Sequence, residues 1–212
     1  MDGFHDLVSG SRGFFAQLAA NNARAWFADR KADYEARVKR PAELLLDDIA
    51  ATLSRDLNVA TKPKLYRVHR DVRFSKDKTP YNTHLHMQWS MPDAPVCYLF
   101  GASAVYCKLG VGAMVFPKDA ITMWRARVDE GADVVEAASA LQAAGGEMSE
   151  PELKRVPAPY DPDHPQAEHL KRKGLILWHD LSEAEAQSLT TVLPARFAEA
   201  DGFRRALVSA LA

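Results

Sequence analysis

Cysteine is scarce in this sequence, and neither a strong excess of charge nor a long apolar run is present. Two cysteines among 212 residues, without a CxxC spacing, do not indicate a zinc-binding or disulfide-rich architecture. The 27 basic and 28 acidic residues leave a net charge of −1, which disfavours a protein that coats nucleic acid with its whole surface. No stretch approaches the roughly 18 apolar residues of a membrane-spanning helix.

The beginning of the chain, MDGFHDLVSG, lacks a basic segment followed by an apolar one. We therefore expect no secretory signal and a cytoplasmic location. Cys97 and Cys107 both lie in an apolar region, where a disulfide across a hairpin is geometrically conceivable. A reducing cytoplasm favours two buried thiols instead.

Several signatures of catalytic sites are missing. Neither GxxxxGK[ST] nor a GxGxxG between strand and helix is present, so a phosphate-binding loop is not expected. There is no GxSxG, and Asp71 or His84 as a general base rests on sequence proximity alone. His84 and His86 could join His69 and Asp71 in a metal site, but HxH is a weak signal and the neighbouring cations oppose a divalent ion. We expect no metal and no cofactor.

The length and a hydrophobic content of 47% suit one sizeable core, and we expect residues 1–212 to form a single domain. Its predicted parts are a helical segment at about 1–57, a sheet at about 64–116 and a mixed helical and strand part at about 117–212. Consecutive short strands without intervening helices favour an antiparallel sheet. The predicted fold class is therefore α+β, with N-terminal helices packed on an antiparallel sheet and a helical C-terminal region.

Helical spacing is clearest near the N-terminus. Trp26, Arg30, Tyr34 and Val38 recur every four residues and form one stripe, so we expect Trp26 and Tyr34 to pack against the sheet. Pro41 can either open a third helix or kink a continuous one.

Strand spacing begins at about residue 65. Leu85, Met87 and Trp89 alternate with polar residues, which predicts a strand with one buried face. The other predicted elements are strands at 96–101, 104–109, 111–116 and 175–181, helices at 121–128 and 132–144, and a capping box formed by Ser182 and Glu185.

Positive charge is concentrated between Lys62 and His84. This stretch holds seven Lys and Arg residues against Asp71 and Asp77, a local charge of 7 − 2 = +5, so the rest of the chain carries −1 − 5 = −6. Arginine side chains present paired donors that suit phosphate or carboxylate groups. The turn signal SKDKTP within the stretch, residues 75–80, could add backbone amides to an anion-binding site.

These residues resemble the domain-of-unknown-function family 2461, whose signature has the form RxxRDxRFxx[DN]KxxY. The matching residues are Arg67, Arg70, Asp71, Arg73, Phe74, Asp77, Lys78 and Tyr81. The N-terminal pattern around Trp26 and the segment YDPDHP at 160–165 are also similar to the family. Family members often have a strongly glycine-rich strand after the hairpin, where this chain has only Gly110-Val111-Gly112. The resemblance implies no particular activity.

If the stretch after Leu65 is a strand, alternation places Arg67, Asp71 and Arg73 on one face and Arg70 with Phe74 on the other, apolar face. A buried Arg70 needs a carboxylate, and Glu35 is one candidate. The motif then supports three interpretations: an internal Arg–Asp network, a pocket for an anionic ligand, or a nucleic-acid or other interaction surface.

We favour the pocket, because seven cations cannot be neutralised by two local acids. The sequence then predicts a small ligand that carries phosphate or carboxylate, with or without catalysis, and a nucleic-acid partner is disfavoured. Nothing in the sequence indicates a membrane partner or fixes an oligomeric state. The expected ligand-binding residues are Arg67, Arg70, Asp71, Arg73, Asp77, Lys78, Tyr81 and His84.

Overall fold

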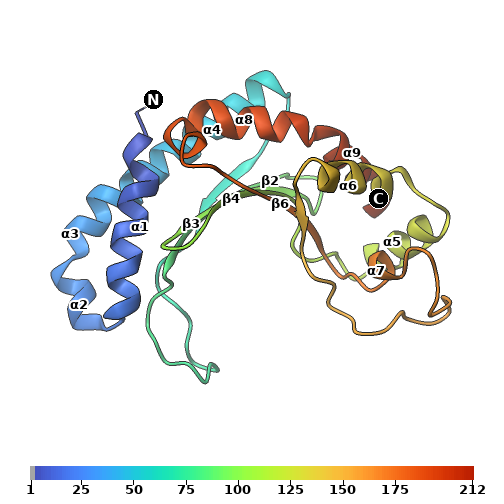
Figure 1. Ribbon diagram of the computed structural model, residues 1–212, viewed down its shortest axis with the longest axis horizontal. Coiled ribbons are helices and arrows are strands. Elements are labelled where there is room, and N and C mark those ends of the chain that lie inside the picture. The colour runs from blue at the N-terminus through green and yellow to red at the C-terminus, as the bar shows by residue number, and fades with distance from the viewer. Residues whose placement is uncertain (1–2) are drawn as a thin grey trace. The chain divides into compact units, whose positions relative to one another are not determined.

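The computed structural model, described here for residues 3–212, confirms an α+β fold with a six-stranded antiparallel sheet and helices at both ends of the chain (Figure 1). The strands are β1 (Lys62–Leu65), β2 (His84–Ser90), β3 (Cys97–Ser103), β4 (Cys107–Ala113), β5 (Glu147–Met148) and β6 (Leu175–Asp180), in the order β1-β2-β3-β4-β6-β5. The helices are α1 (His5–Ala20), α2 (Arg24–Asp29), α3 (Lys31–Tyr34), the π-helical turn η1 (Glu35–Lys39), α4 (Arg40–Asp56), α5 (Ala120–Asp129), α6 (Asp133–Ala143), α7 (Ala167–Leu170), the 3-10 turn η2 (Glu185–Gln187), α8 (Leu189–Glu199) and α9 (Asp201–Leu211).

The chain forms two compact units, each drawn from separate stretches of the sequence. The first unit takes the residues up to Trp89, then Leu99–Leu109 and Asp180–Ala195. The second unit takes Ser90–Tyr98, Gly110–His179 and Arg196–Ala212. A single domain over residues 1–212 therefore stays a prediction.

In the first unit, α4 covers the apolar face of β2. Leu85, Met87 and Trp89 are buried, as their alternation predicts, while the residues between them are half-buried. The Trp89 indole Nε1 donates to the Leu46 carbonyl at 2.8 Å, so the largest side chain of the strand is both packed and hydrogen-bonded. Leu45, Leu46, Ile49 and Leu53 supply the helix face.

The helical stripe that starts at Trp26 is not one helix. The chain breaks at Arg30, between α2 and α3, and then passes through η1 into α4. Pro41 lies in the first turn of α4 and has no N–H to donate, so the wider π-helical spacing of η1 accommodates it inside a nearly continuous helical run. Trp26 is half-buried and contacts Phe14 and Arg30, so its predicted docking on the sheet is wrong, and Phe27 is the buried residue of α2.

The second unit contains the two predicted helices α5 and α6 and most of β6. Trp124 of α5 is fully buried, with its ring 5.0 Å from that of Phe116. The predicted strands at 104–109 and 111–116 are one strand, β4, which runs through both glycines. A side chain at Gly112 would come within 2.0 Å of the Leu175 carbonyl oxygen, so the close pairing of β4 with β6 requires glycine there.

Local predictions near residue 182 and at the cysteines are confirmed. The Ser182 hydroxyl and backbone N–H both donate to Glu185, at 2.7 and 2.9 Å, and the Glu185 N–H donates back to the hydroxyl, which makes the capping box. Cys97 and Cys107 are buried free thiols. Among residues 3–212, no helix combines the length and apolar character needed to cross a bilayer.

Candidate functional site

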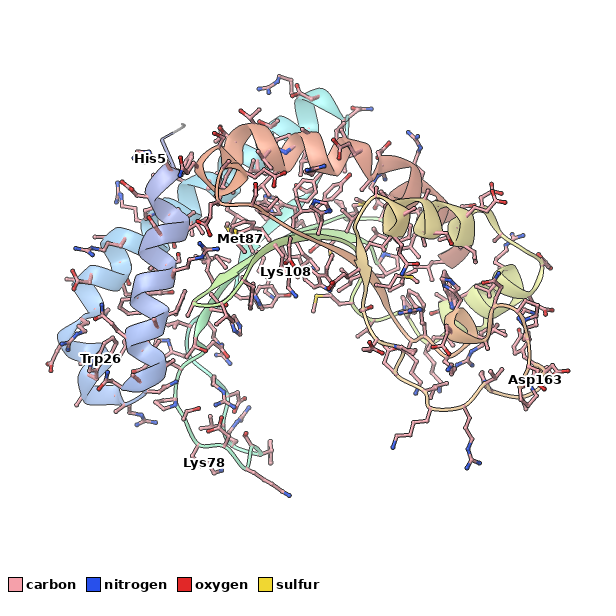
Figure 2. All side chains as sticks on the ribbon, in the orientation of Figure 1. His5, Trp26, Lys78, Met87, Lys108 and Asp163 are labelled. Carbon is pink, nitrogen blue, oxygen red and sulfur yellow. The ribbon has the colours of Figure 1, made fainter. Side chains whose placement is uncertain are left out.

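The basic motif does not continue β1 as a strand. Residues 66–83, which we call the basic loop, leave the sheet after Leu65 and return to it at His84; Figure 2 labels Lys78 in its distal part. Two backbone bonds tie its two arms around the isolated bridge between His69 and Tyr81: the Arg70 N–H donates to the Pro80 carbonyl at 2.9 Å, and the Asn82 N–H donates to the Val68 carbonyl at 2.7 Å. The predicted strand alternation still describes burial from Tyr66 to Arg73, where even-numbered residues are buried or half-buried and odd-numbered ones are exposed, and it fails from Phe74 on.

Phe74 and Val68 show the consequence. Strand alternation puts them on one apolar face, yet Phe74 is 96% exposed and Val68 only 5%. The turn residues between Asp71 and Pro80 prevent regular strand pairing, because their backbone is held by side chains instead of by a partner strand. The shape of the loop then depends on those side-chain bonds.

Arg70 is the centre of one such set of bonds. Its Nη1 lies 2.5 Å from an Asp77 carboxylate oxygen and 3.1 Å from the Thr79 carbonyl, and it also donates to the Thr79 hydroxyl. The expected carboxylate partner is present, but it comes from the loop. Glu35, the candidate from the sequence, instead pairs with Lys39 at 3.0 Å.

Asp77 closes the distal turn of the basic loop. Its carboxylate accepts the Thr79 backbone N–H at 2.9 Å and the Thr79 hydroxyl at 3.0 Å. These bonds, first the backbone N–H and then Arg70, lower the pKa of Asp77 to about 2. The carboxylate is thus ionised at neutral pH and is committed to holding the loop.

Arg73 and Asp71 form a second internal pair. The Arg73 Nε and Nη2 atoms lie 3.0 and 2.7 Å from the two Asp71 oxygens, a two-point contact that lowers the pKa of Asp71. Lys78 points back into the loop, where its Nζ donates to the Val72 carbonyl at 3.0 Å. Lys78 thus has a carbonyl partner and no carboxylate partner.

Counting these pairs shows how much charge stays uncompensated. Residues 62–84 hold seven cations, and two of them are ion-paired, which leaves 7 − 2 = 5 without a carboxylate of residues 3–212 within 4.0 Å. Arg67 is exposed, and its charge contributes from a distance to lowering the pKa of the Asp71 carboxyl. The five cations are Lys62, Lys64, Arg67, Lys76 and Lys78.

Tyr81 anchors the base of the loop to the N-terminal helices. Its ring stacks on Phe27 at 4.2 Å and 18°, and the residue is 6% exposed. Asn22 donates from Nδ2 to the Tyr81 carbonyl at 2.9 Å and accepts the Tyr81 N–H at 3.1 Å. The Tyr81 ring is thus a packing element that fixes where the loop leaves the helices.

His84 begins β2 and belongs to a cluster of rings on the polar face of that strand. The His84 and His86 rings stack at 3.8 Å, and His86 Nε2 lies 2.7 Å from the Tyr106 hydroxyl. Gly101 of β3 makes room for this pair, because a Cβ there would lie 2.9 Å from His86 and 3.2 Å from Tyr106. We call His84, His86 and Tyr106 the His–Tyr cluster.

Burial sets the protonation of the His–Tyr cluster. Desolvation, followed by the charges of His84 and Lys108, lowers the pKa of His86 to about 4, and burial also lowers the pKa of His84. Burial raises the pKa of Tyr106. At neutral pH two uncharged imidazoles therefore meet a protonated phenol, an arrangement that can accept or pass on a proton.

The structure thus places seven of the eight predicted residues in three groups and leaves Arg67 apart. Arg70 joins Asp77, Arg73 joins Asp71 beside Lys78, and Tyr81 with His84 lies where the loop returns to the sheet, while Arg67 stays exposed. Tyr106 and Gly101 were missed by sequence reasoning, although a glycine inside the apolar run at 96–105 was a signal of a close contact. Across residues 3–212, no three His, Cys, Asp or Glu side chains gather in a way that could hold a metal ion.

A groove of about 540 Å³ lies elsewhere in the first unit, between α1 and η1. Gly10 permits this packing, since a Cβ at that position would lie 3.3 Å from the Arg37 carbonyl oxygen. The groove lining shares no residue with the basic loop or the His–Tyr cluster. This groove and the densest positive charge are therefore in different places.

Comparison with known proteins supports the resemblance seen in the sequence. The family described as "Conserved hypothetical protein (DUF2461)" matches residues 11–203. No curated protein and no solved structure matches the chain.

Proposed function

The chain belongs to the DUF2461 family, and we propose that its first unit binds a small anionic ligand that carries a phosphate or carboxylate group. The proposed contacts come from the basic loop and from His84 at its base. We also propose a cytoplasmic location, which the two free thiols support.

One observation carries the proposal: five cations of residues 62–84 have no carboxylate of residues 3–212 within 4.0 Å. A loop whose charges served only its own folding would pair them with nearby acids, as Arg70 and Arg73 do. Uncompensated cations around a fixed turn instead attract an anion, since local positive potential raises the concentration and the affinity of negative ligands.

The pairs divide the predicted site into a frame and a contact set. Arg70 with Asp77 and Arg73 with Asp71 form the frame, because each arginine already has a carboxylate partner. Arg67 and Lys76 form the contact set, since both are exposed and neither has an ion-pair partner in the described part of the chain. Tyr81 holds the frame against α2.

Phosphate titration tests the proposal. We expect inorganic phosphate to shift the NMR signals of Arg67 and His84 saturably, and we expect Arg67→Ala to weaken binding about tenfold or more, as loss of a charge-assisted bond does. Arg55→Ala is the matched control, because Arg55 is an exposed arginine of the same unit that pairs with its neighbour Asp56. Equal binding by both variants, or no saturable shift in the wild type, contradicts the proposal.

A second candidate, binding of single-stranded nucleic acid, is favoured by Phe74. This ring is 96% exposed, and the Arg73 guanidinium lies 5.9 Å from its centre. Exposed aromatic rings beside cations stack on bases while the cations contact phosphates. In a fluorescence-anisotropy titration with a labelled oligonucleotide, this function predicts that Phe74→Ala weakens oligonucleotide binding and leaves phosphate binding unchanged. If Phe74→Ala changes neither oligonucleotide binding nor phosphate binding, Phe74 belongs to neither site.

A further inference from the structure

Arg172, in the second unit, is a buried charge without a counter-ion. It is 3% exposed, and among residues 3–212 no other Lys, Arg, Asp or Glu is so buried. Removing a guanidinium from water costs several kcal/mol unless a partner of opposite charge or several acceptors replace the water. The contacts of Arg172 therefore need a complete account.

The guanidinium of Arg172 makes one hydrogen bond within the described chain, from Nη1 to the Ser149 carbonyl. Its Nε is buried and has no partner. Glu152, Glu168 and Glu150 act on its charge from a distance, but within residues 3–212 none of them lies within 4.0 Å, and the first two are engaged elsewhere. Glu152 accepts the Lys173 N–H at 2.6 Å, and Glu168 pairs with Lys171.

The unoccupied part of Arg172 is the edge that arginine uses for carboxylates. A guanidinium has five N–H donors, and its Nε–Nη2 edge matches the two oxygens of a carboxylate. Arg73 shows this contact within the same protein, with Nε and Nη2 at 3.0 and 2.7 Å from Asp71. Because Ser149 occupies only Nη1 of Arg172, the corresponding edge carries no acceptor.

His169 adds a second buried atom without a partner, one turn before Arg172. It is 6% exposed, and its Nδ1 has no hydrogen-bond partner. Its backbone is fixed, because the Trp124 indole donates to the His169 carbonyl at 2.9 Å and Arg125 donates to the next carbonyl, that of Leu170, at 3.3 Å. The Arg172 N–H also donates to the His169 carbonyl, at 3.2 Å. Two unsatisfied polar groups are thus held in one short, well-anchored turn.

We propose that Arg172 and His169 form a binding site for the carboxylate group of a small molecule, separate from the basic loop. The carboxylate contacts the Nε–Nη2 edge of Arg172 in two places, and the neutral imidazole of His169 donates an N–H to it. The ligand carboxylate thereby serves as the counter-ion that Arg172 does not have among residues 3–212. The segment 154–166, which contains no helix or strand, borders the turn along the chain and provides the part of the fold that can open for entry.

Acetate is the probe, and the side-chain N–H signals of arginine are the readout. In the full-length wild type we expect acetate to shift the Arg172 Nε–H signal saturably and downfield, as formation of a charge-assisted bond does. Arg172→Lys should weaken acetate binding at least about tenfold, because lysine cannot make the two-point contact. Arg55→Lys is the control, since it changes an arginine whose same edge is already filled by Asp56, and it should leave acetate binding at Arg172 unchanged.

Three results would overturn the proposal. One is an Arg172 Nε–H signal that does not respond to acetate in the wild type, a measurement that holds even if the variants fail to fold. Another is saturation by inorganic phosphate without saturation by acetate, which assigns a different ligand chemistry. The third is equal acetate affinity in the wild type and Arg172→Lys. Because the basic-loop proposal is read at Arg67 and His84, each proposal can fail without the other.

Discussion

Asn22 holds the backbone of Tyr81 from both sides, with its Nδ2 donating to the carbonyl at 2.9 Å and its Oδ1 accepting the N–H at 3.1 Å. The two residues are 59 positions apart, so this amide joins the turn between α1 and α2 to the returning arm of the basic loop. The Asn22 side-chain amide makes the two hydrogen bonds that a neighbouring strand would make to the Tyr81 backbone. It therefore fixes the base of the basic loop without a long series of strand-to-strand hydrogen bonds.

Asn22→Ala should therefore destabilise the protein by about 1–3 kcal/mol, because two partly buried backbone groups lose their partners. Urea denaturation measures the change. Asn21→Ala is the matched control: Asn21 is exposed and donates only to the Gln17 carbonyl of its own helix end, so its loss should cost less. Equal effects of the two substitutions would show that the Asn22 contact does not stabilise the loop.

Asp77 should give the protein an acid-sensitive element. Its pKa in the folded chain is about 2, below the ordinary value near 4, so the carboxylate favours the folded state above pH 4 and loses that contribution as the pH falls toward 2. NMR titration of the Asp77 carboxyl carbon checks the value directly. Asp77→Asn should flatten the stability profile between pH 4 and 2.

Arg70→Met separates the two causes of this pKa. We expect the pKa of Asp77 to rise only in part, since the Thr79 backbone N–H bond at 2.9 Å, its largest cause, remains. A complete return to the ordinary value would assign the effect to Arg70 instead. If the pKa of Asp77 does not change at all, Arg70 does not contribute to lowering it.

Phe27, and not Trp26, should be the residue of α2 that stability depends on. Phe27 is 4% exposed and contacts Phe14, Tyr34 and Tyr81, whereas Trp26 is half-buried. Phe27→Ala should cost about 3–5 kcal/mol as a core truncation, and Trp26→Ala clearly less. Chemical denaturation of the two variants decides; the reverse order would restore the stripe that the sequence suggested.

The accuracy of the sequence predictions follows the range of the interactions involved. The alternation of Leu85, Met87 and Trp89 and the capping box at Ser182 depend on neighbours within a few residues, so both could be read correctly. The basic loop was predicted only in part, because burial alternates as expected up to Arg73 and the alternation ends at Phe74, where no partner strand continues the pairing. Phe74 shows where the prediction failed, since alternation places it on a buried face and it is exposed where the loop has no partner strand.

The site was predictable to the same extent. A carboxylate partner for Arg70 followed from charge alone, while its identity as Asp77, and not Glu35, depended on the path of the loop. Tyr106 escaped notice because its contact with His86 crosses from the turn after β3 to β2, 20 residues apart. The residue types predict which kinds of side chain pair with one another. Which particular side chains come into contact depends on the path of the folded backbone.

Gly101→Ala tests whether the rings of the His–Tyr cluster pack directly against the β3 backbone at Gly101, where no side chain intervenes. A Cβ at Gly101 would lie 2.9 Å from His86 Cδ2 and 3.2 Å from Tyr106 Cε2, so at least one ring must move. We expect a loss of about 1–3 kcal/mol from overpacking. We also expect the pKa of His86, which burial lowers to about 4, to rise as the displaced ring gains water, and histidine NMR titration measures this.

Gly13→Ala is the matched control, because no atom lies within 4 Å of a Cβ in that helical position, and the substitution should stabilise the protein by about 0.5–1 kcal/mol. If Gly101→Ala behaves like Gly13→Ala and the His86 titration is unchanged, the rings do not rest on Gly101. If instead the pKa rises and stability falls together, the absence of a side chain at position 101 is what keeps His86 neutral and bonded to Tyr106.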